Sequence, residues 1–223
     1  MKLIVDIETC FTRNDEVRSR IADGIKHPAT MSKKETIDKW EAEKKPLAVD
    51  EAVSKTALSA SYGEITCIGY CSLDGEVISI ARDDTKSEAE LLTMFFDQVS
   101  TMINKNTSIQ IIGFNVLFDY EFLRIRSIIN GIKPPFDMPT LKAWDKRIYD
   151  VKNEFYGESV SVSGIRNSLD NTAKLLSING KYNGISGAEA PKMWLDGKYA
   201  ELSSYCAQDV EMTREIYKRI NFL

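Results

Sequence analysis

The chain has little of what a zinc site requires. Its 223 residues include one histidine, His27, and no two cysteines in the C-x-x-C spacing. Structural zinc sites are built from Cys and His ligands at short, regular spacings, so we do not expect one here. Four cysteines are present: Cys10, Cys67, Cys71 and Cys206. We interpret them as small buried hydrophobic residues of a protein in a reducing compartment.

Long apolar runs and an excess of positive charge are also missing. No run approaches the roughly 20 apolar residues of a membrane helix, and Met1 to Asp6 has no signal-peptide layout. We therefore expect a soluble cytoplasmic protein that does not bind membranes. The net charge of −4 excludes the strongly basic surface of a non-specific nucleic-acid coat. A negative net charge is nevertheless compatible with a local nucleic-acid site, because a site that holds divalent cations needs a cluster of carboxylates.

Hydrophobic periodicity indicates an α/β protein. Apolar and β-branched runs predict strands at residues 2–7, 64–72, 77–81, 108–114 and 146–151. The pair Asp74-Gly75 predicts a tight turn between the second and third of these strands. Apolar residues at helical spacing predict helices at residues 87–103, 119–130, 162–177 and 199–220. We expect one domain, residues 1–223, with a mixed central sheet flanked by helices.

Residues 14–54 differ from the rest of the chain, since they are charged, rich in lysine and poor in β-branched residues. We interpret this segment as a helical insertion after the first strand. Ser32 followed by Glu35 predicts a capping box that opens a helix through Trp40.

Carboxylates occur in three separate segments. Asp6 and Glu8 follow an apolar run, and they point to the same face because side chains on a strand alternate. Asp119 lies near the start of a predicted helix, where an acid also complements the helix dipole. Tyr205 and Asp209 are four residues apart, so they lie on one face of the terminal helix. Each feature alone has an ordinary structural explanation.

Taken together, these segments carry a resemblance. The stretches VDIET (5–9), GFNVLFDYEFL (113–123) and YCAQDVEMT (205–213) resemble the three signature motifs of the DEDD superfamily of 3′–5′ exonucleases, in the same order. The Tyr-x-x-x-Asp spacing is similar to that of the tyrosine branch. The histidine branch has a histidine five residues before the last aspartate, where this chain has Ser204.

A finer likeness extends along most of the chain. It is to stand-alone exonucleases related to the exonuclease domain of family-B DNA polymerases. The residues that carry it lead up to the third motif: Ser168-Leu169-Asp170, Leu175-Leu176, Gly180-Lys181, Gly187 and Trp194 to Gly197. The resemblance implies a ribonuclease H-like (exonuclease) fold.

The resemblance also implies two divalent cations, Mg²⁺ or Mn²⁺, as cofactors. Asp6 would bridge them, Glu8 and Asp209 would complete the one nearer the nucleophile, and Asp119 would serve the other. Tyr205 would position the attacking water. Such hard cations suit carboxylate ligands.

Three further residues are candidates for contacting the substrate. Thr9 follows the first acids and is expected to face the terminal nucleotide. Asn115 resembles a polar residue of the second motif that contacts the scissile end, and Phe118 is expected to pack in the core or to stack on a base. For Asp150 we favour an ordinary turn acid over a supporting role at the site, and Lys181 could either approach phosphate or remain solvated.

The predicted function is hydrolysis from the 3′ end of DNA, with single-stranded or frayed ends as substrate. One alternative is an RNA exonuclease of the ribonuclease D type, since the motifs do not distinguish the two sugars. Another is a catalytically silent module that binds nucleic acid, which the presence of all four acids with Tyr205 disfavours. Replication or repair proteins are further candidate partners. Residues 14–54 are then either a charged exposed helix, the favoured interpretation, or a flap beside the substrate channel.

Overall fold

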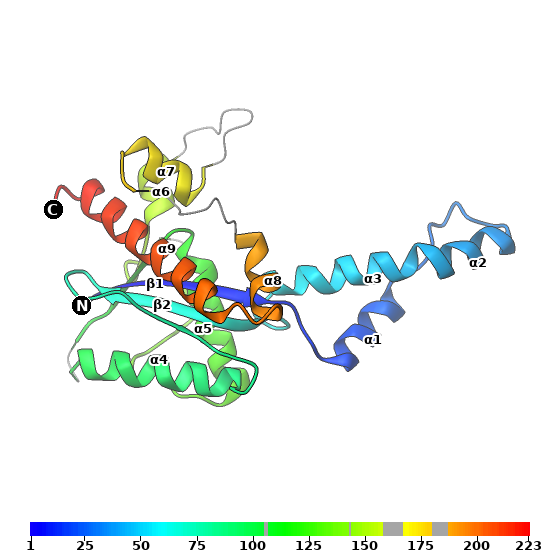
Figure 1. The fold of residues 1–223 in the computed structure, drawn as a ribbon, viewed down its shortest axis with the longest axis horizontal. Coiled ribbons are helices and arrows are strands. Elements are labelled where there is room, and N and C mark those ends of the chain that lie inside the picture. Colours follow the sequence, from blue (N-terminus) through cyan, green and yellow to red (C-terminus); the bar gives the residue numbers. More distant parts are fainter. Residues whose placement is uncertain (105–106, 143, 158–166, 180–186) are drawn as a thin grey trace. The chain divides into compact units, whose positions relative to one another are not determined.

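The computed structural model describes residues 1–104, 107–142, 144–157, 167–179 and 187–223 (Figure 1). The chain divides into two compact units. One, the sheet unit, comprises Met1–Glu8 and Ile65–Leu223. The other, the helical unit, comprises Thr9–Glu64.

A five-stranded sheet of order β3-β2-β1-β4-β5 forms the centre of the sheet unit. Strands β1, β4 and β5 are parallel neighbours, whereas β2 and β3 pair antiparallel. The register places Ile4 beside Ile112, and Ile112 beside Tyr149. The strands are β1 (Lys2–Cys10), β2 (Glu64–Ser72), β3 (Ile78–Ala81), β4 (Gln110–Gly113) and β5 (Ile148–Asp150). The predicted mixed sheet is therefore confirmed.

Helices cover both faces of this sheet. They are α4 (Glu88–Met102), α5 (Val116–Asn130), α6 (Val151–Tyr156), α7 (Leu169–Leu175), α8 (Ala190–Leu195) and α9 (Tyr199–Ile220), with a 3₁₀ turn η3 (Gly187–Glu189) before α8. Ser87 and Glu90 form a reciprocal capping box at the start of α4. Gly131, with φ of +67°, ends α5 in the left-handed conformation that glycine tolerates best.

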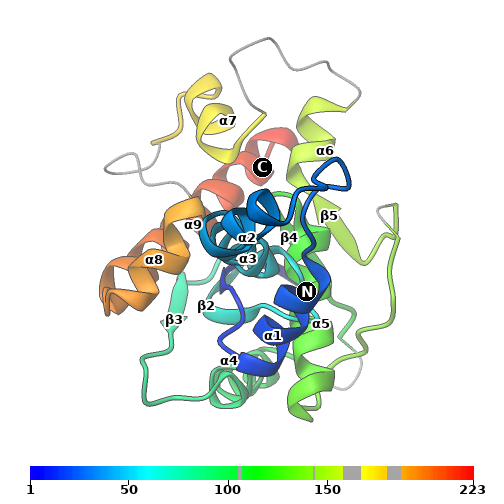
Figure 2. The ribbon, with the colours of Figure 1, turned by 90° about the vertical axis from the view of Figure 1, so that its right-hand side faces the viewer.

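Alternation along the strands separates two layers of the core. Ile4 and Cys71 face α9, where they pack with Val210 and Ile216. Tyr70, one residue before Cys71, lies on the opposite face and makes an edge-on contact with Phe95 of α4. Helices α4 and α5 pack together on that side, while α9 lies along β3 on the other (Figures 1 and 2).

The helical unit contains α1 (Asp15–Gly24), α2 (Lys34–Glu43), α3 (Lys45–Ser54) and the 3₁₀ turn η1 (Lys55–Leu58). Asn14 caps α1 by accepting hydrogen bonds from the backbone N–H groups of Glu16 and Val17. Helix α3 packs against both α1 and α2. The helical character expected for residues 14–54 is thus present. Their interpretation as an insertion within a single exonuclease domain stays a prediction.

The predicted capping box at Ser32 and Glu35 is wrong. Helix α2 begins at Lys34, and its N-cap residue, Lys33, makes no side-chain capping hydrogen bond. Glu35 is therefore the second residue of the helix, one position short of the site from which a glutamate can reach back to the cap.

Other element boundaries shift by a few residues. Strand β1 continues through Cys10 rather than ending at residue 7, and α5 begins at Val116 rather than at residue 119. The predicted helix at 162–177 falls partly outside the described residues, and the part within them is α7. Helix α9 spans residues 199–220 as predicted.

All four cysteines are buried, as expected, and none of them forms a disulfide in the structure. None of the described helices combines the length and the apolar composition needed to cross a bilayer.

Candidate active site

Three carboxylates converge on the face of the sheet that α9 covers. Asp6 and Glu8 project from β1, and Asp209 projects from α9. One oxygen from each of the three lies within 4.8 Å of the others. Glu8 and Asp209 are 7 % and 6 % exposed, so two residues about 200 positions apart in the chain share one buried acidic cluster.

Asp119 reaches the same strand from the first turn of α5. Its Oδ1 accepts a hydrogen bond of 3.0 Å from the backbone N–H of Ile7, the residue between Asp6 and Glu8. Strand β1 is paired with β4 only as far as Ile4. The N–H of Ile7 lies beyond this pairing, and the Asp119 carboxylate supplies its hydrogen-bond acceptor. Asp119 is 4 % exposed and is not one of the three carboxylates within 4.8 Å of one another.

The turn before α5 explains how Asp119 is placed. Asn115 adopts a left-handed conformation, with φ of +67° and ψ of +40°, which asparagine tolerates better than most residues. Its backbone N–H donates to Asp150 Oδ1 over 3.1 Å. Asp150 also caps α6 by accepting from the backbone N–H groups of Lys152 and Asn153. Asp150 therefore acts as a turn and capping acid, the interpretation favoured from sequence.

Burial and like charges set the protonation states of the cluster. The pKa of Asp119 is raised to about 8, mainly by burial and to a smaller extent by the charges of Asp150 and Asp209, while the hydrogen bond from Ile7 opposes the shift. Burial also raises the pKa of the Tyr205 hydroxyl far above its ordinary value, with added contributions from Asp209 and Glu8. Tyr205 therefore remains a protonated phenol, and its hydroxyl is hydrogen-bonded to Asp209.

Cys206 supports Asp6, a role that the sequence alone did not indicate. Its thiol lies 3.5 Å from the backbone oxygen of Asp6 and 3.7 Å from Asp6 Oδ2, within hydrogen-bonding range for sulfur. Burial raises the pKa of this thiol well above its usual value, so the sulfur keeps its proton and acts as the donor. The absence of a side chain at Gly69 lets α9 approach β2 this closely, since a Cβ there would lie 2.8 Å from Cys206 Sγ.

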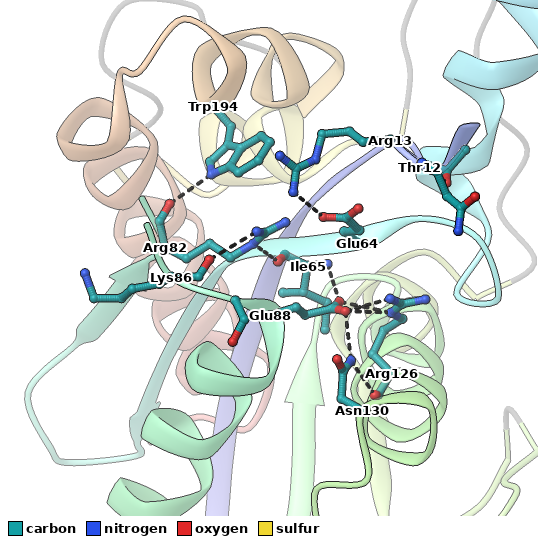
Figure 3. Close-up of polar contacts among 12 residues, drawn as sticks. Thr12, Arg13, Glu64, Ile65, Arg82, Lys86, Glu88, Arg126, Asn130 and Trp194 are labelled. Carbon is teal, nitrogen blue, oxygen red and sulfur yellow. Dashed lines mark hydrogen bonds and ion pairs between the residues drawn. The ribbon is translucent and has the colours of Figure 1, made fainter. Parts of the chain in front are cut away.

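A buried polar network fixes the start of β2 (Figure 3). Glu88 accepts hydrogen bonds from the backbone N–H of Ile65 at 2.7 Å and from the guanidinium of Arg126. On the other side of the strand end, Arg82 donates to the Ile65 carbonyl, and the Trp194 indole donates to the Arg82 carbonyl. These residues come from four elements and the loop after β3, so no local sequence pattern could have revealed the network.

Thr66 connects this network to the carboxylates. It is fully buried, follows Ile65, and donates from its hydroxyl to the backbone oxygen of Glu8 over 3.1 Å. The strand that carries Glu8 is thereby held to β2 at the position of the candidate ligand.

The residues predicted to contact substrate differ in their burial and in their contacts. The hydroxyl of Thr9 is buried and donates to the backbone oxygen of Ala57 over 2.8 Å. Phe118 is half-buried and packs on Phe122 with ring centroids 4.8 Å apart, while Asn115 is exposed. Residues 180–186, including Lys181, lie outside the described residues. The substrate roles of Thr9, Asn115 and Phe118 stay predictions.

Known proteins resemble this chain in sequence and in fold. An uncharacterised protein of Methanocaldococcus jannaschii is 26 % identical over 175 residues, which cover 74 % of this chain and 90 % of that protein. The family B DNA polymerase of the hyperthermophilic archaeon Pyrobaculum calidifontis has a similar structure, with a TM-score of 0.62 and 15 % identity. That match covers 99 % of this chain but 24 % of the polymerase, so the chain spans about a quarter of the polymerase. The similarity confirms the expected ribonuclease H-like fold.

Residues 64–223 match a family described as predicted 3′–5′ exonucleases related to the exonuclease domain of PolB. The match begins where the helical unit ends, and it includes Asp119, Tyr205 and Asp209 but not Asp6 or Glu8. Since it spans well over half of the sequence, the chain belongs to this family of predicted 3′–5′ exonucleases related to the PolB exonuclease domain.

Proposed function

We propose that the chain is a 3′–5′ exonuclease of the tyrosine branch of the DEDD superfamily, acting on single-stranded or frayed DNA 3′ ends with two divalent cations. The observation that carries the proposal is the convergence of Asp6, Glu8 and Asp209 within 4.8 Å. The helical unit is, in this proposal, an insertion in a single exonuclease domain.

The carboxylate cluster fits hard cations. Its donors are all oxygen atoms, which suit Mg²⁺ or Mn²⁺ rather than softer metals. Carboxylates this close repel one another and are costly to bury, so bound cations would relieve both effects. When bound, such cations neutralise charge on the phosphate and lower the pKa of an attacking water.

Each carboxylate has a proposed place in that arrangement. Asp6, supported by Cys206, would be shared between the two cations. Glu8 and Asp209 would complete one site, and Asp119, which is held at β1 by the backbone N–H of Ile7, would serve the other.

Tyr205 would orient the attacking water by hydrogen bonding rather than by removing its proton. Because its pKa is raised by burial and by the charges of Asp209 and Glu8, the hydroxyl stays protonated. Asn115 and Phe118 would contact the terminal nucleotide from the start of α5. Thr9 would do so through its methyl group or backbone, since its hydroxyl is bonded to Ala57.

Digestion of a 5′-labelled single-stranded DNA oligonucleotide tests the proposal. With Mg²⁺ or Mn²⁺ we expect a ladder that shortens from the 3′ end with release of mononucleotides, and EDTA should stop it. Asp6→Asn and Asp209→Asn should abolish the ladder while circular dichroism shows an unchanged fold, because each removes a charge from a repulsive cluster. Wild-type activity in Asp209→Asn would overturn the assignment.

The same assay separates the alternatives. An RNA oligonucleotide of the same sequence should be degraded more slowly than the DNA. Faster degradation of RNA would reassign the substrate. Binding of either nucleic acid without metal-dependent hydrolysis would identify a silent binding module.

A further inference from the structure

The helical unit contains a pocket of its own. It has a volume of about 440 Å³ and lies between α1 and the segment that runs from the end of α3 through η1 to Tyr62. One wall is apolar and consists of Val17, Ile21 and Ala52, all of which are half-buried. The volume is within the range of pockets that hold small molecules or single side groups.

Beside the hydroxyl residues Thr56 and Ser59, the rest of the lining consists of two cationic side chains and one aromatic ring. Arg20 of α1 and Lys55 of η1 are exposed at the pocket, and the Tyr62 ring is 46 % exposed. Lys55 pairs with Glu51 over 2.7 Å, but both side chains are about two-thirds exposed, so this ion pair is weak and readily exchanged. The lining residues all fall in the fully described stretch 9–64, and none of them is acidic.

This combination matches single-stranded nucleic acid. Bases stack on exposed aromatic rings and pack on apolar surfaces, while phosphates pair with nearby Arg and Lys side chains. We propose that the pocket of the helical unit binds a nucleotide of the single-stranded substrate, with its base against Tyr62 and the apolar wall and its phosphate at Arg20 and Lys55. This inference rests on the proposed function, which supplies a polyanionic substrate to a chain of net charge −4.

The pocket wall is hydrogen-bonded to the first residues of the helical unit. The helical unit begins at Thr9, the residue directly after Glu8. The Thr9 hydroxyl donates to the Ala57 oxygen over 2.8 Å, and the Thr12 backbone N–H donates to Thr56 Oγ1 over 2.9 Å. Since Thr56 lines the pocket and Ala57 follows it, these bonds hold that wall to residues 9–12 at the start of the helical unit.

A double variant, Arg20→Ala with Tyr62→Ala, tests the proposal. With Ca²⁺ in place of the catalytic metal, the dissociation constant for fluorescein-labelled oligo(dT) should rise by about 5- to 100-fold, as expected for loss of one stacked base. With Mg²⁺, KM for oligo(dT) should rise by a similar factor. Hydrolysis of the p-nitrophenyl ester of thymidine 5′-monophosphate, which is too small to reach a second subsite, should be unchanged.

Two further variants separate a specific effect from loss of charge or of folding. Lys39→Ala with Leu58→Ala removes one exposed cation and one exposed apolar side chain of the same unit, neither of which lines the pocket, so it should bind oligo(dT) as the wild type does. Tyr62→Phe keeps the ring and should retain affinity.

Equal affinity of the pocket double variant and the wild type for oligo(dT) would overturn the proposal, as would equal losses in both double variants. A change in oligomeric state without a change in DNA affinity would instead assign the pocket to a protein. Failure of the wild type to hydrolyse the ester would count against the proposed function only, because binding in Ca²⁺ still tests the pocket.

Discussion

Replacing Gly69 with alanine adds one methyl group where β2 meets α9. The new Cβ would lie 2.8 Å from both Cys206 Sγ and Val210 Cγ2, and 3.1 Å from the Cys206 backbone oxygen. The two side chains are short and held on the helix, and the third atom is backbone. Rotamer changes therefore cannot relieve the overlap, so α9 has to move.

The size of that movement follows from ordinary contact distances. Carbon and sulfur contacts settle at about 3.5–4.0 Å, so α9 must shift by roughly 0.7–1.2 Å. A misplacement of about 1 Å at a reacting centre costs about 10²-fold in rate, and Asp209 and Tyr205 both move with the helix. Overpacking of this kind destabilises by about 1–3 kcal/mol, which lowers Tm by about 2–12 °C for a chain of this size.

The assay compares Gly69→Ala with Gly24→Ala. Gly24, at the end of α1, has no atom within 4 Å of the position its Cβ would take, so its replacement should leave both activity and Tm near wild type. For Gly69→Ala we expect loss of metal-dependent digestion together with a lower Tm. Full activity at an unchanged Tm would show that the close approach of α9 to β2 does not position the carboxylates.

Further variants probe individual groups of the cluster. The pKa of Asp119 is raised, so its contribution to the stability of the metal-free protein is present below about pH 4 and is lost as pH rises through about 8. In EDTA, the Tm of Asp119→Asn should therefore increase relative to that of the wild type as pH rises to about 9. A Tm difference between the two proteins that does not change with pH would refute this. Cys206→Ala should raise the Mn²⁺ concentration needed for half-maximal activity about tenfold. Cys206→Ser, which keeps a hydrogen-bond donor, should raise that concentration less. Equal increases in the two variants would exclude a donor role of Cys206 toward Asp6. Tyr205→Phe should lower kcat by about 10²-fold without changing the Mn²⁺ affinity measured by calorimetry. Weaker Mn²⁺ binding by this variant would contradict the proposal that Tyr205 only orients the attacking water.

Local patterns were enough to predict the elements that carry the carboxylates. Alternation along a strand places Asp6 and Glu8 on one face, and helical spacing places Tyr205 above Asp209. The mixed sheet and the bounds of α9 also follow from periodicity. These features depend on neighbours within a few residues.

What the sequence did not provide depends on distant contacts. Helix α5 starts before residue 119 because the turn at Asn115 is held by Asp150, which is 35 residues away. The hydroxyl of Thr9 is taken up by Ala57, which lies 48 residues along the chain. Neither contact leaves a periodic signal in the sequence. The close packing of α9 against Gly69 is likewise visible only once the helix and the strand are placed together.

The most direct test of the central claim is a crystal of the protein soaked in Mn²⁺, examined by anomalous scattering. We predict two Mn²⁺ peaks among Asp6, Glu8, Asp119 and Asp209, with Asp6 in contact with both. In crystals of Asp6→Asn, the peaks should be lost or reduced. Absence of Mn²⁺ from this cluster in the wild type, or Mn²⁺ bound only elsewhere, would contradict the proposed cation-dependent mechanism.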